Sequence, residues 1–133
     1  MLENFAVEII SPDNLIIKTE ASEVVIPSYE GQMGILKDHI PLITFLRPGI
    51  VIIKKDTEDK SFFVEDGTIE FSNNNLLILS STVKVLENLK KDYINTVLEN
   101  SQKKMNDDKI SDKEKYLLSY KIQTLREISQ KIS

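Results

Sequence analysis

The chain has 133 residues, of which 41% are hydrophobic and 29% are charged, as is typical of one globular domain with or without a small appendage. It has no cysteine, which excludes disulfides and thiolate metal sites, and no apolar run approaches the roughly 20 residues that cross a bilayer. The net charge of −4 argues against nucleic acid as a partner.

Charge, proline and glycine all divide the chain into two halves. Residues 1–86 include 13 acidic and 7 basic side chains, a net charge of −6, whereas residues 87–133 include 8 acidic and 10 basic side chains, a net charge of +2. All four prolines and all four glycines lie within residues 12–67. Because both residue types mark turns and are costly inside helices, we expect a β domain at 1–86 and a helical domain at 87–133.

Short runs rich in β-branched residues predict the strands of the first half. In chain order these runs are 5–10, 14–18, 23–26, 49–54, 62–64, 68–71 and 76–79. Asp66-Gly67 predicts a hairpin between the runs at 62–64 and 68–71, and Asn73-Asn74-Asn75 predicts the next turn. Many short strands at this spacing favour an antiparallel sandwich or barrel.

The second half predicts two helices that form a hairpin. Each has one narrow apolar stripe: Leu89, Tyr93, Ile94, Val97 and Leu98, then Leu118, Ile122, Leu125, Ile128 and Ile132. Residues 106–108 mark the break, and Ser111 with Glu114 predicts a capping box. Either stripe could be buried on the other helix or on a partner. The predicted fold class is α+β, with an N-terminal antiparallel β-sandwich followed by a C-terminal antiparallel two-helix hairpin.

Residues 25–49 contain a dense set of motif residues. The set is Pro27, Glu30, Gly31, Gly34, Ile35, Leu36, His39, Pro41, Leu42, Thr44, Leu46, Pro48 and Gly49. At this spacing it resembles the signature of the ATP synthase epsilon family, and Phe62-Phe63-Val64 with Gly67 and Glu70 resembles a second family segment. The chain departs from the pattern at Ser28, at Lys37-Asp38 and at Asp66.

The resemblance implies a non-catalytic rotor subunit of a bacterial F-type ATP synthase, equivalent to the mitochondrial delta subunit. Such a subunit joins the gamma subunit to the membrane c-ring and so couples ring rotation to the catalytic head. The resemblance also implies peripheral association with the cytoplasmic face of the inner membrane. In agreement with that location, residues 1–4 lack the basic and apolar pattern of a secretory signal.

The resemblance further implies that the segment rich in Gly and Pro is a loop that docks on polar loops of the c-ring. Gly31 and Gly34 permit backbone conformations that are closed to other residues, and the prolines stiffen the surroundings. The candidate ring-facing residues are Glu30, Gly31, Gln32, Lys37, Asp38 and His39. Each glycine could instead only shape a turn, and His39 could be a contact or a structural loop residue.

In many relatives the C-terminal hairpin extends along gamma and blocks ATP hydrolysis. By that resemblance, the candidate contacts with the alpha/beta head are Lys113, Lys115, Lys121 and Arg126, although solubilising charge would also explain them. ATP-sensing relatives have Asp-x-x-Arg-Ala on the first helix, whereas here Asn95 and Thr96 follow Asp92 in place of Arg-Ala. We therefore expect no useful ATP binding, because lysine does not supply the bidentate fork of arginine.

Residue types that catalysis needs are scarce. The chain has one histidine, no phosphate-binding Gly-rich loop followed by Lys-Ser/Thr, and no pair of histidines at metal-ligand spacing. We therefore expect no catalytic residue, no cofactor and no metal site. The alternative function is a free-standing β-sandwich adaptor or small-ligand-binding module. Co-purification with a gamma subunit would discriminate between the two.

Overall fold

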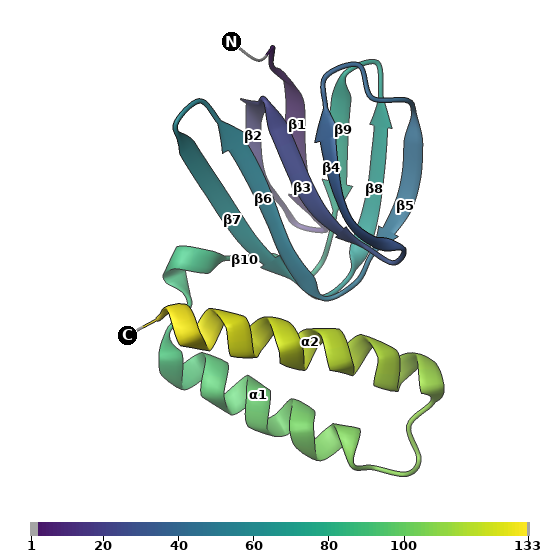
Figure 1. Cartoon of the computed structure of the whole chain (residues 1–133), viewed down its shortest axis with the longest axis vertical. Coiled ribbons are helices and arrows are strands. Elements are labelled where there is room, and N and C mark those ends of the chain that lie inside the picture. Colours follow the sequence, from purple (N-terminus) through teal and green to yellow (C-terminus); the bar gives the residue numbers. More distant parts are fainter. Residues whose placement is uncertain (1–2, 133) are drawn as a thin grey trace.

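The computed structural model describes residues 3–132, in which a β domain is followed by two helices that lie across one end of it (Figure 1). The strands are β1 (Phe5–Ser11), β2 (Asn14–Ala21), β3 (Glu23–Ser28), β4 (Gly31–Leu36), β5 (Leu42–Leu46), β6 (Gly49–Lys55), β7 (Glu58–Val64), β8 (Gly67–Ser72), β9 (Asn75–Leu79) and β10 (Lys84–Val85). A short 3-10 helix, η1 (Leu86–Asn88), leads to α1 (Lys91–Met105) and α2 (Asp112–Lys131).

The described strands form one sheet that curls into a sandwich. Their order is β10-β7-β6-β3-β5-β8-β9-β1-β2, and β4 pairs with β3 beside this path. β3 pairs with β6 through residues 23–25 but with β5 only at Ser28, so the two layers separate along β3. The predicted β-sandwich is confirmed, with one difference. β1 and β9 run parallel, because both strands descend from the end of the sandwich that lies away from the helices (Figure 1).

Alternating side chains of the strands fill the interior of the sandwich. Phe5, Val7 and Ile9 of β1 are buried, and Phe71 of β8 meets Phe5 edge to face with ring centroids 5.6 Å apart. This period of two is what a sheet with one buried face requires. Each such side chain contributes about 1.5–3 kcal/mol by leaving water, so the sandwich has a core of its own.

A second apolar cluster joins the helical hairpin to the sandwich. Phe63 of β7 is buried together with Ile94 of α1 and with Leu125 and Ile128 of α2. The predicted apolar stripes are therefore buried on each other and on the sandwich, although Tyr93 is exposed. The Ser111 hydroxyl accepts a hydrogen bond from the Glu114 amide at 3.1 Å, which confirms the N-cap half of the predicted capping box. The Glu114 carboxylate lies 3.5 Å from the same hydroxyl rather than at the Ser111 amide. Neither helix within residues 3–132 is long and apolar enough to cross a membrane.

The predicted hairpin at Asp66-Gly67 is wrong. β7 pairs with β6 and β10, whereas β8 pairs with β5 and β9, so residues 65–66 cross from one layer to the other. Gly67 has a φ of 144°, and a Cβ at this position would lie 2.4 Å from the carbonyl oxygen of Leu79. The glycine is therefore needed for a close crossover rather than for a tight turn. The turn predicted at 73–75 is confirmed between β8 and β9.

Candidate partner-docking surfaces

Much of the segment predicted as a docking loop is strand. β3 continues to Ser28, β4 follows after two residues, and β5 follows after five more. Two glycines within the six residues of β4 hid the strand from sequence analysis, because they read as turn residues. Among the described strands β4 pairs with β3 alone, so its other edge is open to a partner.

The six candidate ring-facing residues lie along and beyond this edge strand. Glu30, Gly31 and Gln32 are at the β3–β4 turn beside the helical hairpin, whereas residues 37–39 follow the far end of β4 (Figure 1). The four strand residues at 33–36 separate the two groups, and residues 30 to 37 span about 20 Å along the strand. The candidates therefore form an elongated ridge with two ends, which we call the β4 ridge (residues 30–39), and not a single loop.

The two glycines of the β4 ridge have different roles. Gly31 has a φ of 137°, a conformation that other residues rarely adopt, as predicted. Gly34 has no positive φ, so the predicted role is wrong there. A Cβ on Gly34 would instead lie 2.8 Å from a carboxylate oxygen of Glu23, so this glycine leaves room for a cross-strand side chain.

At the far end of the β4 ridge the charged residues already have partners. Lys37 pairs with Glu3 at 2.7 Å, and this hydrogen-bonded ion pair raises the pKa of Lys37. The Asp38 amide donates to Asn74 Oδ1 at 2.7 Å, and Asn74 Nδ2 donates to Asp38 Oδ1 at 2.9 Å. The ring of His39 lies edge to face with Phe71, with centroids 6.0 Å apart. These contacts give residues 37–39 a structural role beside any role in docking.

The outer side of the layer formed by β5, β8, β9, β1 and β2 exposes an apolar surface that sequence analysis missed. Strand registers align two rows on this side: Phe45, Thr68, Leu79, Ile10 and Leu15, then Ile43, Glu70, Leu77, Glu8 and Lys18. Ile43 is 78% exposed and Phe45 61% exposed. We call these two rows the outer apolar face. A contiguous exposed patch of this kind marks an interaction site, whereas single exposed apolar residues do not.

Two carboxylates lie among the apolar side chains of this face. Glu8 and Glu70 line a hollow of about 360 Å³ together with Ala6, Ile10 and Leu77. Lys18 lies opposite Glu8 in the same row, so the face has two acidic groups and one basic group, and a partner that fits it combines apolar side chains with a net basic charge. The signal available in the sequence was that Leu-Ile-Thr-Phe-Leu, at 42–46, is apolar at adjacent positions, which predicts a strand covered on both faces.

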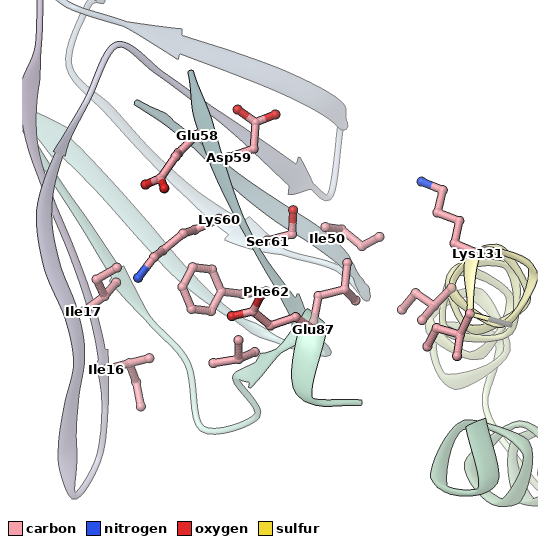
Figure 2. A pocket seen from close by; sticks show the side chains of 14 residues that line it. Ile16, Ile17, Ile50, Glu58, Asp59, Lys60, Ser61, Phe62, Glu87 and Lys131 are labelled. Atoms are coloured by element: carbon pink, nitrogen blue, oxygen red, sulfur yellow. The ribbon is translucent and has the colours of Figure 1, made fainter. Parts of the chain in front are cut away.

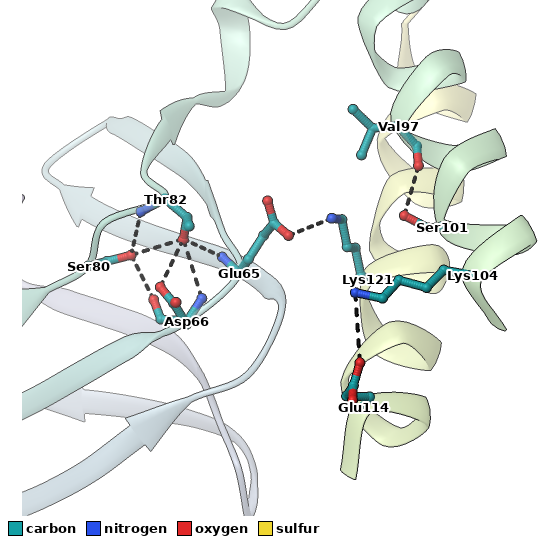
Figure 3. A network of polar contacts seen from close by, with 9 residues as sticks. All are labelled: Glu65, Asp66, Ser80, Thr82, Val97, Ser101, Lys104, Glu114 and Lys121. Atoms are coloured by element: carbon teal, nitrogen blue, oxygen red, sulfur yellow. Dashed lines mark hydrogen bonds and ion pairs between the residues drawn. The ribbon is translucent and has the colours of Figure 1, made fainter. Parts of the chain in front are cut away.

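Three side-chain contacts hold α2 against the sandwich. The Lys121 ammonium lies 2.6 Å from a carboxylate oxygen of Glu65, whose own amide donates to Thr82 at 2.9 Å (Figure 3). The Arg47 guanidinium lies 3.7 Å from the ring centre of Tyr120. The Tyr116 hydroxyl donates to the carbonyl oxygen of Tyr29 at 2.9 Å.

The four hairpin residues predicted to contact the catalytic head have different environments. Lys121 is half-buried and faces the sandwich, whereas Lys113, Lys115 and Arg126 are exposed on α2. The structure therefore does not bring the four together as one basic surface. Lys121 becomes available to another partner only if its ion pair with Glu65 breaks.

A cavity of about 640 Å³ lies between the sandwich and the C-terminal end of α2 (Figure 2). Ile16, Ile17 and Phe62 form its apolar wall on the sandwich, and Ile128 and Ile132 close it from the hairpin. The hairpin therefore supplies one part of the lining, and the sandwich and the segment after it supply the rest. Within residues 3–132, no group of three or more His, Asp or Glu residues is placed to hold a metal ion.

The amino-acid sequence matches known proteins along most of its length. Residues 4–85 match the family model described as ATP synthase, Delta/Epsilon chain, beta-sandwich domain. The ATP synthase epsilon chain of Pelagibacter ubique is 40% identical over 130 residues, which cover 97% of this chain and 100% of the relative. The ATP synthase epsilon chain of Rhizobium etli (strain CIAT 652) is 31% identical over 108 residues, or 80% of each chain.

The fold matches chains of two solved assemblies. One is a chain of the Euglena gracilis mitochondrial ATP synthase, solved as OSCP, F1 and c-ring, with a TM-score of 0.76 at 15% identity, covering 98% of this chain and 83% of that one. The other belongs to the central stalk and c-ring of the Tetrahymena thermophila mitochondrial ATP synthase, with a TM-score of 0.65 at 16% identity, covering 99% and 98%. These likenesses show a shared fold of sandwich and helices.

Proposed function

This chain belongs to the ATP synthase delta/epsilon family, and from that premise we propose which of its surfaces hold it in the rotor. It is an epsilon-type, non-catalytic subunit of the central stalk, and so a peripheral part of a membrane complex. The family match favours this function over a free-standing adaptor, because it covers the sandwich from residue 4 to residue 85. The proposed location is the cytoplasmic face of a bacterial inner membrane.

The gamma subunit docks on the outer apolar face. The observation that carries this assignment is the alignment of exposed apolar side chains on five neighbouring strands, interrupted by the carboxylates of Glu8 and Glu70. A rotor subunit has to transmit torque without slipping, which needs a broad and well-packed contact. A buried apolar centre with complementary charge provides such a contact.

The β4 ridge contacts the c-ring. Glu30 and Gln32 are exposed at one end of the ridge, and Asp38 is exposed at the other. Polar groups spread over about 20 Å suit contact with the repeated polar loops of a ring better than a single tight pocket would. The ridge and the outer apolar face are different surfaces of the sandwich, so gamma and the ring can be bound at the same time.

The helical hairpin has the regulatory role. Lys113, Lys115 and Arg126 are exposed on α2, where they can meet acidic surfaces of the alpha/beta head if the hairpin extends. In the conformation described here α2 is held on the sandwich by Glu65, Arg47 and Tyr29, which is a state that leaves the head free. Inhibition of ATP hydrolysis would then require loss of these contacts.

The assignment of the outer apolar face is tested by Ile43→Asp. Because the side chain is 78% exposed, the substitution is expected to change the free energy of unfolding by about 0.5 kcal/mol or less. Affinity for the purified gamma subunit of the same synthase, measured by isothermal titration calorimetry, should fall at least tenfold, or about 1.4 kcal/mol. Tyr93→Asp on α1 is the matched control and should bind as wild type does. Unchanged affinity of the Ile43→Asp protein would contradict the assignment.

A further inference from the structure

The outer apolar face does not end at the edge of the sandwich. Phe45, at its β5 side, has its ring centroid 6.2 Å from that of Tyr29 in the β3–β4 turn. The Tyr29 ring is in turn 6.2 Å from Tyr116 of α2, and Tyr116 is 5.0 Å from Tyr120. These four rings form a continuous aromatic row that passes from the sandwich to the helical hairpin.

The row is accessible in the sandwich at Phe45 and in the hairpin at Tyr116. Phe45 is 61% exposed and Tyr116 is 38% exposed, so neither ring is covered by the rest of the chain. A stable interface covers about 800 Å² of each partner, a patch roughly 30 Å across. A subunit that covers Phe45 as part of such a patch extends past Tyr29 and reaches Tyr116.

We propose that the gamma-docking surface includes Tyr116 and therefore spans the boundary between the sandwich and the hairpin. The partner is a surface that is apolar over the aromatic row and basic opposite Glu8 and Glu70. The proposal rests on the proposed function, because it takes gamma to be the subunit that covers the outer apolar face. Its consequence is that bound gamma holds α2 against the sandwich.

Gamma binding and hairpin docking favour each other reciprocally. If Tyr116 contributes to affinity only while α2 lies on the sandwich, gamma binds the docked conformation better than the undocked one. Thermodynamic linkage then requires gamma to favour hairpin docking by the same factor by which docking favours gamma. When the hairpin extends to reach the catalytic head, it loses this part of the gamma contact. It also loses the three contacts that hold α2 on the sandwich.

Affinity measurements with the full-length chain separate this inference from the proposed function. Phe45→Ala tests the outer apolar face, Tyr116→Ala tests its extension, Tyr116→Phe keeps the ring without the hydroxyl, and Tyr93→Ala is an equally exposed control, at 40%. We expect gamma affinity to fall at least tenfold for Phe45→Ala and about three- to tenfold for Tyr116→Ala. Tyr116→Phe should lose less affinity than Tyr116→Ala, because it keeps the ring and removes only the hydroxyl bond to Tyr29, and Tyr93→Ala should stay within twofold of wild type.

Hairpin position is measured in the same proteins by spin labels. The chain has no cysteine, so Lys55→Cys on β6 and Gln123→Cys on α2 give one defined pair, and both sites are exposed. Adding gamma should increase the population at the docked distance in wild type and increase it less in Tyr116→Ala. Two outcomes would overturn this inference but leave the proposed function intact. One is a Tyr116→Ala protein that binds gamma as tightly as wild type does while Phe45→Ala binds more weakly. The other is a docked population that falls when gamma is added. Wild-type affinity of Phe45→Ala overturns the proposed docking face itself.

Discussion

Lys121 shows how a residue that looks like surface charge in the sequence has a defined partner in the fold. From its position in a basic helix, Lys121 was predicted either to contact the catalytic head or to serve as solubilising charge. Neither interpretation included its ion pair with Glu65, which is 56 positions away in the sequence. The two side chains are only 20% and 32% exposed, so the ion pair is less screened by water than most surface pairs. The amide of Glu65 is also hydrogen-bonded to Thr82, which orients its backbone.

The Lys121–Glu65 pair is expected to contribute to hairpin docking. In a double-mutant cycle with Lys121→Ala and Glu65→Ala, the coupling energy for docking should be about 1 kcal/mol. It is measured from the docked fraction in the spin-label experiment. The charge swap, Lys121→Glu with Glu65→Lys, should restore most of the docking that either single reversal removes. Lys115→Ala, at an exposed position of the same helix, is the control, and a coupling energy of zero would refute the role of the pair.

Two glycines predict losses of stability of different size for the same substitution. Gly34→Ala places a Cβ near the flexible end of Glu23, which can move, so the free energy of unfolding should fall by less than about 1 kcal/mol. Gly67→Ala places a Cβ 2.4 Å from a backbone oxygen at a φ of 144°, so the loss should be about 2–3 kcal/mol or more. Urea unfolding of the two variants gives both values. Equal losses would show that the crossover at Gly67 is not as close as described.

At the level of elements, sequence analysis succeeded where local signals determine the structure. The helix break at 106–108, the cap at Ser111 and the apolar stripes are local, and each was predicted. The seven predicted runs all lie within strands, because they are rich in β-branched residues, whereas β5 and β10 were not predicted. These features depend on residues within about four positions of one another.

The elements that sequence analysis missed depend on contacts between distant residues. Asp66-Gly67 has the residues of a hairpin turn, but β7 finds its partners in β6 and β10, and the sequence around the turn contains no sign of this. β4 was missed because its two glycines look like turn residues in the sequence. Gly34 is explained only by the Glu23 side chain across the sheet, and Gly31 by the turn at the start of the strand. The aromatic row joining Phe45 to Tyr116 also has no local signature. Pairing between strands and helices creates these features.

The β4 ridge predicts different effects at its two ends. Glu30→Lys changes an exposed side chain, so it should weaken assembly with the c-ring while leaving the free energy of unfolding within about 0.5 kcal/mol. Asp38→Lys removes the hydrogen bond that the Asp38 carboxylate accepts from Asn74 and places a lysine at a φ of 67°, so it should cost about 1–2 kcal/mol of stability as well. Thermal unfolding and co-purification with the ring measure the two effects. Full assembly of the Glu30→Lys protein would remove that end of the ridge from the interface.

For the whole molecule, the two apolar clusters predict a modular chain. The sandwich core is formed by residues of the sandwich alone, whereas Phe63, with Ile50 and Leu86 beside it, packs on the hairpin. A truncated protein of residues 1–86 should therefore fold but expose Phe63 at its hairpin end.

We expect the truncated protein to unfold cooperatively at a lower temperature than the full chain and to retain weakened gamma binding. The lower stability follows from the loss of the cover over Phe63, and the weaker binding follows from the loss of Tyr116. Calorimetric unfolding and titration with gamma provide both measurements. Phe63→Ser in the truncated protein should reduce association between copies, since it removes the exposed ring. Loss of cooperative unfolding in residues 1–86 would contradict the division at residue 86.

The parallel pairing of β1 with β9 has a consequence for how the chain is made. β1 lies between β2 and β9 in the sheet, and its pairing partner for Ala6 is Asn75, 69 residues later. At about 5–20 residues per second, a ribosome needs about 3–14 s to supply that partner, during which one edge of an apolar strand stays unpaired. Unpaired strand edges invite pairing between chains. Synthesis of β9 is therefore the step that closes the sandwich, and a nascent chain stalled before residue 75 remains open to aggregation.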